Sequence, residues 1–286
     1  MTALVIESEW IVPVASPAIQ HGCLVVESGI VRFLGDRLPA EFASCRRIQL
    51  TGGAILPGLI NSHCHLEFSD LDSPIAVPGA PGSMVAWLKS VMAHRQALAQ
   101  SRYDSSTPNP EEVLQHRCRA VQVGVREAWE TGTRWLVDNV TAPWEPNWIE
   151  DSLNDLIPSP TQAVGQLFPV SSGGAERPSP LLVRPCIEIV DVTRSRAAET
   201  WEFAMALRNR MQQNRKASVL DTLGYAPHAP YTASTEIVGL ASQAAAEPGG
   251  LVSFHLAEST EEREWTESRT GPFADWLGSR VEIGRA

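Results

Sequence analysis

The sequence predicts an α/β fold, in which a parallel sheet with crossover helices follows a short all-β segment. Three observations support this prediction. Residues 3–50 show the period-two alternation typical of strands, as in the run from Leu24 to Glu27. From residue 54 onward, apolar runs of strand length alternate with amphipathic runs of helix length. The 286 residues, of which 43% are hydrophobic, are enough to bury a sizeable core.

The first 53 residues are predicted to form a β segment of their own. A second alternating run extends from Ile30 to Gly35, and Gly29 between the two runs is a hairpin signal. We therefore assign residues 1–53 to this segment and residues 54–286 to the α/β domain. The N-terminal stretch has no basic region before its apolar residues, so we expect no signal peptide.

Five strands, with helices between them, are expected after residue 53. The apolar run 54–60 is interpreted as a buried strand that ends in a polar loop, residues 61–65. The other expected strands are 134–140, 181–192, 219–226 and 251–256. The expected helices are 84–92, 114–129, 197–211, 235–246 and 259–268. Residues 143–180, rich in Pro, Ser and Gly, are predicted to form a long loop with one short helix. A doubly wound sheet and part of a (β/α)₈ barrel both fit this pattern.

Composition excludes several classes of protein. The formal net charge of -10 argues against a surface for nucleic acid or an anionic membrane. No apolar run reaches the roughly 18 residues that a membrane span requires. The five cysteines are far apart and form no Cys-x-x-Cys pair, which argues against a disulfide framework and against a cysteine-built zinc site. We expect a cytoplasmic protein whose partner is a small-molecule substrate.

The pair His63 and His65 is the first candidate metal site. Side chains two residues apart on a strand share a face, so both imidazoles point the same way while Cys64 points to the other face. Neutral imidazoles suit zinc, iron or nickel. The alternative is two unrelated polar residues that close a strand. Glu67 has the same parity, and we expect it to contact substrate or support the ligands, with a solvated side chain as the alternative.

The surrounding residues resemble a known family. Residues 53–67 have the sequence Gly-Ala-Ile-Leu-Pro-Gly-Leu-Ile-Asn-Ser-His-Cys-His-Leu-Glu. This segment resembles the first barrel strand of the amidohydrolase superfamily, more narrowly its cytosine deaminase, chlorohydrolase and adenosylhomocysteine deaminase branch. Residues 83–95 and 270–277 resemble, more loosely, the aminodeoxyfutalosine deaminases. The resemblance implies an N-terminal part of a β-sandwich and an incomplete (β/α)₈ TIM-type barrel, with about five of eight strands present.

The resemblance also implies a set of metal ligands and a proton carrier. His63 and His65 would bind the metal, and Val252–Ser259 resembles the family's His-x-x-Glu segment. By that resemblance His255 is the third ligand and Glu258 is the general acid and base. From the sequence alone, Glu258 also fits the first turn of a helix, where the helix dipole favours acidic residues.

Three more residues are expected to contact substrate. Residues 225–232 resemble the family's Pro-His-x-Pro-Tyr segment, which implies a catalytic, substrate-binding role for His228. A turn histidine with a structural hydrogen bond is the alternative for His228. His94 and Arg95 lie on the predicted helix after the first barrel strand, where side chains border the pocket in this family.

The implied activity is hydrolysis of a C–N bond that is not a peptide bond. A metal-bound hydroxide would deaminate a purine- or nucleoside-like substrate, with Glu258 passing a proton to the leaving amine. In the family, members with two metal ions often bridge them with a carboxylated lysine. Lys89 and Lys216 fall in predicted helices and neither is expected to reach the site. We therefore expect one divalent ion, zinc with iron as the alternative. The alternatives are a chlorohydrolase that acts on a halogenated ring and a non-catalytic relic or scaffold.

The sequence departs from the family at its C-terminal end. The family continues through three more strands, which supply another histidine and a metal-binding aspartate. No residue after 277 matches these strands, and Asp138 and Asp191 stand at earlier strand ends. We therefore expect a C-terminally truncated chain with low stability and little activity. Its open sheet edges would favour self-association into a homo-oligomer.

Overall fold

The computed structural model describes residues 3–77, 79, 82–100, 110–156, 181–190, 194–213 and 222–278. The chain divides between Leu59 and Ile60 into two compact units. The smaller unit contains residues 3–59, and the larger unit contains the described residues from Ile60 onward.

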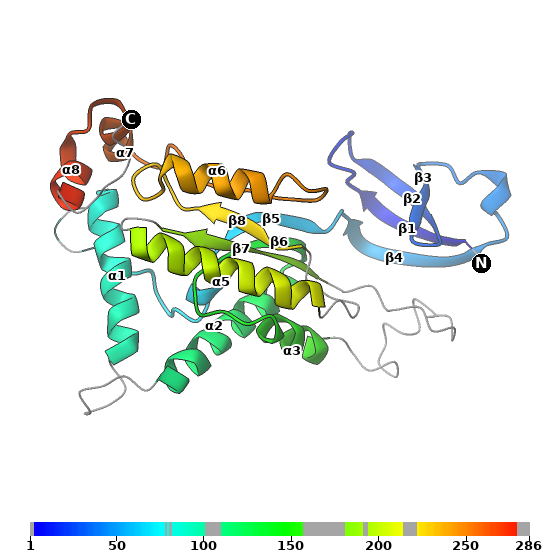
Figure 1. The fold of residues 1–286 in the computed structure, drawn as a ribbon. Helices are drawn as coiled ribbons and strands as arrows, with labels where there is room; N and C mark the ends of the chain where they lie inside the picture. Colours follow the sequence, from blue (N-terminus) through cyan, green and yellow to red (C-terminus); the bar gives the residue numbers. More distant parts are fainter. Residues whose placement is uncertain are drawn as a thin grey trace. The chain divides into compact units, whose positions relative to one another are not determined.

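The smaller unit is a four-stranded sheet of order β3-β2-β1-β4 (Figure 1). Its strands are β1 (Leu4–Ile11), β2 (Ile19–Glu27), β3 (Ile30–Gly35) and β4 (Arg46–Ile55), with a 3-10 turn η1 (Ala40–Phe42). β2 pairs antiparallel with both β1 and β3, whereas β1 and β4 are parallel. The predicted hairpin is confirmed: Gly29 has φ 76°, a left-handed conformation that suits glycine. Alternate residues of β1 and β2 form the core, including Val5 and Val25.

The larger unit is built on a second four-stranded sheet, of order β5-β6-β7-β8. Its strands are β5 (Leu59–Cys64), β6 (Thr133–Val140), β7 (Leu182–Ile189) and β8 (Gly224–Pro227). The β6–β7 and β7–β8 pairs are parallel, which confirms the predicted α/β class. The helices are α1 (Met84–Gln100), α2 (Pro110–Glu130), α3 (Asn147–Leu156), α5 (Arg194–Gln213), α6 (Thr235–Ala244), α7 (Thr260–Ser268) and α8 (Gly271–Leu277), with a 3-10 turn η2 (Leu66–Phe68).

The helices α2, α3, α5 and α6 pack against one face of this sheet through a continuous apolar core (Figure 1). Strand alternation separates the two faces along β7. Val183, Ile187 and Ile189 belong to the core beneath the helices, whereas Cys186 packs with Val137 of β6 in a separate cluster. The polar residues that matter for the site come from this second set of strand positions.

The apolar run 54–60 is not the single buried strand that the sequence predicted. Its first two residues end β4, and Leu59 begins β5. Pro57 lies between them and has no N–H to give to a ladder, so the run breaks there. Leu59 and Ile60 are 55% and 64% exposed, because β5 is an edge strand of the sheet that the structure describes.

The predicted strand 251–256 forms only one bridge, between Tyr225 and Val252. Its backbone still follows β8, since Tyr225 N–H donates to the Leu251 carbonyl and Ser253 N–H donates to the Tyr225 carbonyl. The short helix expected after residue 143 is present as α3, whereas the sequence did not predict α8. No helix in the described ranges combines the length and apolar character needed to cross a membrane.

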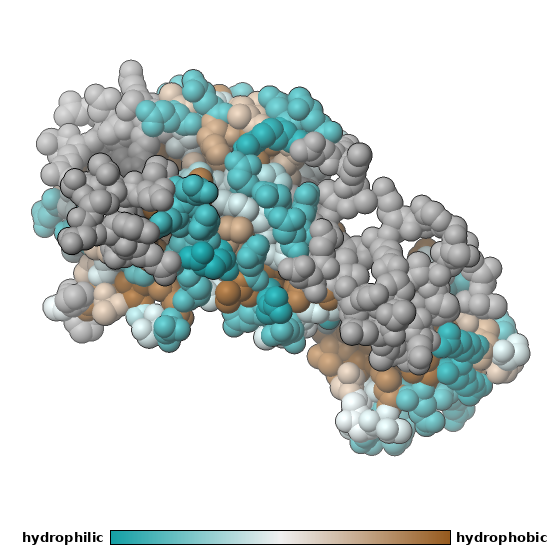
Figure 2. Space-filling view, turned by 90° about the horizontal axis from the view of Figure 1, so that it is seen from below, coloured by the Kyte–Doolittle hydropathy of each residue, from teal (hydrophilic) through white to brown (hydrophobic). Residues whose placement is uncertain are grey.

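The surface is mixed. On the side drawn in Figure 2, hydrophilic residues alternate with patches of apolar ones. Large exposed apolar side chains in the larger unit include Trp87 and Met92 of α1. The apolar spacing in the sequence put Trp87, Val91 and Met92 on one face of this helix; of these Val91 is buried, as is Val85.

Candidate metal centre and adjoining cavity

Four histidines lie together at or just beyond the ends of the strands in the larger unit. The imidazole centroid of His255 lies 4.5 Å from that of His63, 5.6 Å from that of His65 and 4.8 Å from that of His228. The rings of His63 and His65 are 5.2 Å apart. One nitrogen from each of His63, His65 and His255 lies within 4.8 Å of the other two. The three residues expected to bind a metal therefore converge.

Backbone hydrogen bonds between neighbouring strand ends produce this convergence. His228 N–H donates to the carbonyl of Ile189, the last residue of β7, at 3.0 Å. His255 N–H in turn donates to the carbonyl of His228 at 2.8 Å. Strand-like pairing thus continues past β7 and β8, and it aligns the two downstream histidines. Cys64 turns to the helix-covered side, as the alternation predicted.

Three of the four histidines, His63, His65 and His228, are held in the neutral form that metal binding requires. Burial lowers the pKa of His65 to about 4 and that of His228 to about 3, and it also lowers the pKa of His63. Neighbouring imidazoles add to each shift, because a second positive charge so close is unfavourable. At neutral pH these rings offer lone pairs rather than positive charge.

The three ligand candidates fit a metal ion. Nδ1 of His65 is buried and has no hydrogen-bond partner among the described residues, which is costly unless another group binds it. His255 uses Nδ1 to bond the His228 carbonyl, so its Nε2 remains available. The side-chain amide nitrogen of Asn139 lies 2.8 Å from Nδ1 of His63. Three imidazoles leave room for a water molecule in a tetrahedral zinc site.

Asp138 and Lys89, which the sequence also raised as metal ligands, do not join the histidine cluster. Asp138 is buried on the helix-covered side and accepts a hydrogen bond from Leu66 N–H at 2.9 Å. Burial raises the pKa of Asp138 to about 7. Lys89 lies on α1, with Nζ 5.8 Å from the ring centroid of Trp276. Lys216 and Asp191 lie outside the described residues.

Glu258 lies just before α7, in a loop whose backbone N–H groups donate to the buried carboxylate of Glu262. Glu262 is 2% exposed, and it accepts hydrogen bonds from the N–H groups of Ala257 and Glu258 at 3.0 and 2.6 Å. Ser259 is the N-cap of α7 and accepts from Glu262 N–H. The side chain of Glu258 is left exposed, and it accepts a hydrogen bond from the Tyr231 hydroxyl at 3.3 Å.

Tyr231 connects Glu258 to the histidines. Its ring meets that of His228 edge-on, with centroids 5.6 Å apart. Burial raises the pKa of the Tyr231 phenol, so the hydroxyl stays a donor at neutral pH. The two carboxylates therefore differ: Glu262 is buried and holds the backbone before α7, whereas Glu258 is exposed and bonded to Tyr231.

Glu67 lies in a polar network rather than in open solvent. One carboxylate oxygen pairs with Arg95, the other lies 2.9 Å from Nη2 of Arg117, and the Thr141 hydroxyl donates to Glu67. The side chain of Glu67 is only 10% exposed. Sequence reasoning missed Arg117, although its position between Leu114 and Val121 on the apolar face of a predicted helix was a signal.

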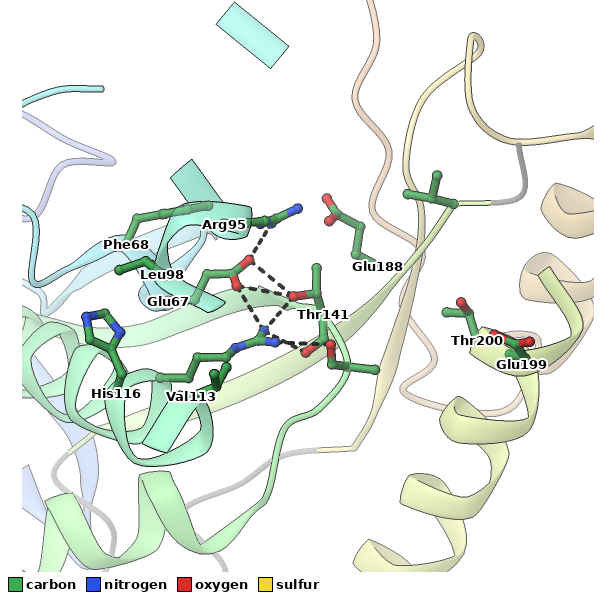
Figure 3. Close-up of a pocket in the computed structure, with 13 residues that line it drawn as sticks. Glu67, Phe68, Arg95, Leu98, Val113, His116, Thr141, Glu188, Glu199 and Thr200 are labelled. Atoms are coloured by element: carbon green, nitrogen blue, oxygen red, sulfur yellow. Dashed lines mark hydrogen bonds and ion pairs between the residues drawn. The ribbon is translucent and has the colours of Figure 1, made fainter. Parts of the chain in front are cut away.

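A cavity of about 370 Å³ opens beside this network (Figure 3). Arg95 and Glu67 line it, whereas His94 does not belong to its lining. Glu188, at the end of β7, lines the cavity from the opposite side. It is also grouped with His228 and His255, since one ligand atom from each of the three lies within 4.8 Å of the others. The cavity and the histidine cluster are therefore adjacent.

The arrangement can bind a divalent ion, hold a proton at Glu258 and enclose part of a small molecule. It combines three features of a hydrolytic site: neutral imidazoles, an exposed carboxylate with a fixed backbone, and an adjoining cavity. Sequence reasoning did not find Glu188. An isolated carboxylate inside the apolar run Leu181–Val190 was the available signal.

Comparison with known proteins gives a consistent result. The chain is 25% identical over 227 residues to an aminodeoxyfutalosine deaminase from a Nitratiruptor species, covering 78% of this chain and 44% of that protein. It is 37% identical over 68 residues to a 5-methylthioadenosine/S-adenosylhomocysteine deaminase from Symbiobacterium thermophilum, covering 23% of this chain and 16% of that protein.

The fold also matches solved structures. A Helicobacter pylori aminofutalosine deaminase in complex with methylthio-coformycin superposes with a TM-score of 0.68 at 19% identity. The match covers 98% of this chain and 57% of that one, so the chain spans about half the length of the proteins it resembles. Residues 54–277 match the model of the amidohydrolase family. This match covers most of the chain, and we conclude that the chain belongs to the amidohydrolase family of hydrolytic enzymes.

Proposed function

We propose that this chain carries the metal centre of a hydrolase that deaminates a purine- or nucleoside-like small molecule. The observation that supports this proposal most strongly is the convergence of the His63, His65 and His255 imidazoles, with the pKa of His63 and of His65 lowered by burial. We propose one divalent ion there, with zinc as the best match to three nitrogen ligands. Such an ion, when bound, lowers the pKa of a coordinated water towards about 7.

Glu258 is the proton carrier in this proposal. Its carboxylate is exposed and lies near the cluster, because Tyr231 contacts both Glu258 and His228. Glu258 takes a proton from the attacking water and gives it to the departing nitrogen. A C–O bond forms at the ring carbon, the C–N bond breaks, and the nitrogen leaves as ammonia. Glu262 keeps the Glu258 backbone in place for both transfers.

His228 orients the substrate. Its ring is buried and neutral, and its Nδ1 is hydrogen-bonded to the Thr232 hydroxyl, which fixes the ring plane. Nε2 then faces the group formed by His255 and Glu188. A ring that is fixed in this way can hydrogen-bond a substrate without reorganising, which favours the transition-state geometry.

The names of the two relatives described above support this reaction class, since both are deaminases. The substrate and the activity of the whole protein are part of the proposal, because the chain spans about half the length of these relatives. The relatives support deamination over the two alternatives, dechlorination of a halogenated ring and a non-catalytic scaffold.

The test is release of ammonia by the zinc-loaded chain from a panel of purines, nucleosides and pterins, with a chlorinated triazine included. We expect ammonia from at least one nucleoside or purine, and a loss of about 10²–10⁴-fold in the Glu258→Gln variant. Glu150→Gln, an α3 substitution, is the control. Chloride release without ammonia would support the chlorohydrolase hypothesis, and neither product from the loaded chain would support the scaffold.

A further inference from the structure

Glu188, near the end of β7, has a buried carboxylate. Its side chain is 5% exposed, and within the described ranges no group donates to it. Nε2 of His228 lies 3.9 Å from a carboxylate oxygen of Glu188, which is too far for a hydrogen bond. Burying a carboxylate without a partner is unfavourable by several kcal/mol, so such a group points to a ligand.

Arg95 faces Glu188 across the cavity. Figure 3 shows the guanidinium of Arg95 and the carboxylate of Glu188 pointing toward the same space. Arg95 is held there by Glu67, and its guanidinium carbon lies 5.2 Å from the Phe68 ring centroid. Its Nε is buried without a hydrogen-bond partner among the described residues. The cavity therefore has a charged donor, Arg95, on one side and a carboxylate acceptor, Glu188, on the other.

The charges of these two residues restrict what binds between them. An anion would suit Arg95 but would meet the carboxylate of Glu188. A cation would suit Glu188 but would meet the guanidinium of Arg95. A neutral hydroxyl satisfies both, because its oxygen accepts from Arg95 while its hydrogen goes to Glu188. Two adjacent hydroxyls span such a gap better than one, and Phe68 and Leu98 provide apolar walls for the attached carbons.

We propose that Arg95 and Glu188 bind the vicinal diol of a sugar, so that the substrate is a nucleoside rather than a free base. Arg95 donates to one hydroxyl oxygen, and Glu188 accepts from a hydroxyl. The inference rests on the proposed function, because it places the base of that nucleoside over the adjacent histidine cluster. Arg117 and Thr141 position Arg95 indirectly, by holding Glu67.

The test compares binding of adenosine and of 2′,3′-dideoxyadenosine, which lacks the diol. Isothermal titration calorimetry on the full zinc-loaded chain uses a Glu258→Gln background to prevent turnover. We expect adenosine to bind at least about tenfold more tightly, the scale of hydrogen bonds to charged groups. Glu188→Gln and Arg95→Gln should each reduce that ratio below about threefold. Glu202→Gln, an exposed substitution on α5, should leave the ratio unchanged.

Several outcomes overturn the inference. Equal binding of the two ligands, no measurable binding of adenosine, or a ratio that survives both substitutions would each do so. A fall in bound zinc in Glu188→Gln would instead make Glu188 a metal ligand and would also overturn it. Circular dichroism melting identifies a variant that fails to fold, and the other substitution then decides. Ammonia release without a diol preference refutes this inference alone, whereas a diol preference without ammonia release refutes the proposed function alone.

Discussion

His255 donates a hydrogen bond from Nδ1 to the backbone carbonyl of His228 over 3.0 Å. A carbonyl oxygen can only accept, so Nδ1 of His255 carries a proton, and Nε2 is the ring nitrogen left to bind a metal. Backbone pairing along β8 therefore sets both the position and the tautomer of the third ligand candidate. The side chain of His228 is not needed for this bond.

Substitution can separate the backbone carbonyl of His228, which bonds His255, from the side chain of His228, which is proposed to orient the substrate. In His228→Asn the backbone carbonyl remains, so we expect zinc affinity to change by less than about threefold. Ammonia release should fall by about 10²-fold or more, because the side chain proposed to orient the substrate is lost. Zinc titration and an ammonia assay on the same preparation check both expectations. A loss of zinc in this variant would show that His228 is a ligand.

Asp138 should make stability depend on pH. Its folded-state pKa is raised by burial to about 7, against an ordinary value of 3.8, so the folded protein holds the proton more tightly. The stabilisation that protonated Asp138 contributes is complete below about pH 4 and is lost as the pH rises through 7. The free energy of unfolding falls by at most about 1.4 kcal/mol per pH unit. Asp138→Asn removes this slope and keeps an acceptor for Leu66 N–H.

Urea unfolding of the wild type and of Asp138→Asn at pH 5 and pH 8 measures this effect. From pH 5 to pH 8, the free energy of unfolding of Asp138→Asn should rise relative to that of the wild type. Asp275→Asn, at an exposed position on α8, should show no such gain. Parallel pH dependence in wild type and Asp138→Asn would contradict the assignment.

Glu67 should contribute to stability through its two arginines. Glu67→Gln leaves Arg117 with 16% of its side chain exposed and no carboxylate opposite. We expect the free energy of unfolding to fall by about 2–4 kcal/mol, because breaking one partner of a largely buried pair strands the other charge. Urea unfolding checks this. A change below about 0.5 kcal/mol would mean that Thr141 and the Ala142 carbonyl, both bonded to Arg117, suffice to hold it.

Gly124 should reverse the usual effect of alanine in a helix. It lies on α2, where an added Cβ would come within 2.7 Å of Leu66 Cδ2 and 2.9 Å of Ser69 Cβ. These residues flank the turn that follows His65, so we expect Gly124→Ala to lower stability by about 1–3 kcal/mol. Gly239→Ala on α6 meets no atom within 4 Å and should raise stability by up to about 1 kcal/mol. Stabilisation by both substitutions would contradict the close packing of α2 on this turn.

The histidine cluster could be predicted because strand ends carry its residues. The resemblance to the amidohydrolase family implied that His63, His228 and His255 meet despite their separation in sequence, and parallel strands do place their ends at one edge of a sheet. The larger unit's strand and helix pattern followed from periodicity. The break at Pro57 was misinterpreted, because an apolar run does not show where one strand ends and the next begins.

The cavity could not be predicted in the same way. Arg117 and Glu188 occupy positions that periodicity assigns to apolar side chains, and only tertiary structure shows which charges face each other. The exposure of Leu59 and Ile60 is likewise a property of neighbours, since it depends on which strand lies beside β5. The sequence also could not show that Glu67, expected to contact substrate or support the ligands, pairs with Arg95 and Arg117.

The most direct test of the account is the amount of zinc bound per chain, measured by elemental analysis after dialysis against buffer with micromolar zinc. We predict one equivalent in the wild type and less than 0.1 equivalent, on the order of a 100-fold loss of affinity, in His65→Ala and in His255→Ala. His21→Ala, exposed in the smaller unit, is the control and should retain the full equivalent. Absence of zinc from the wild type, or zinc retained when His65 and His255 are both replaced, would contradict the proposed metal centre.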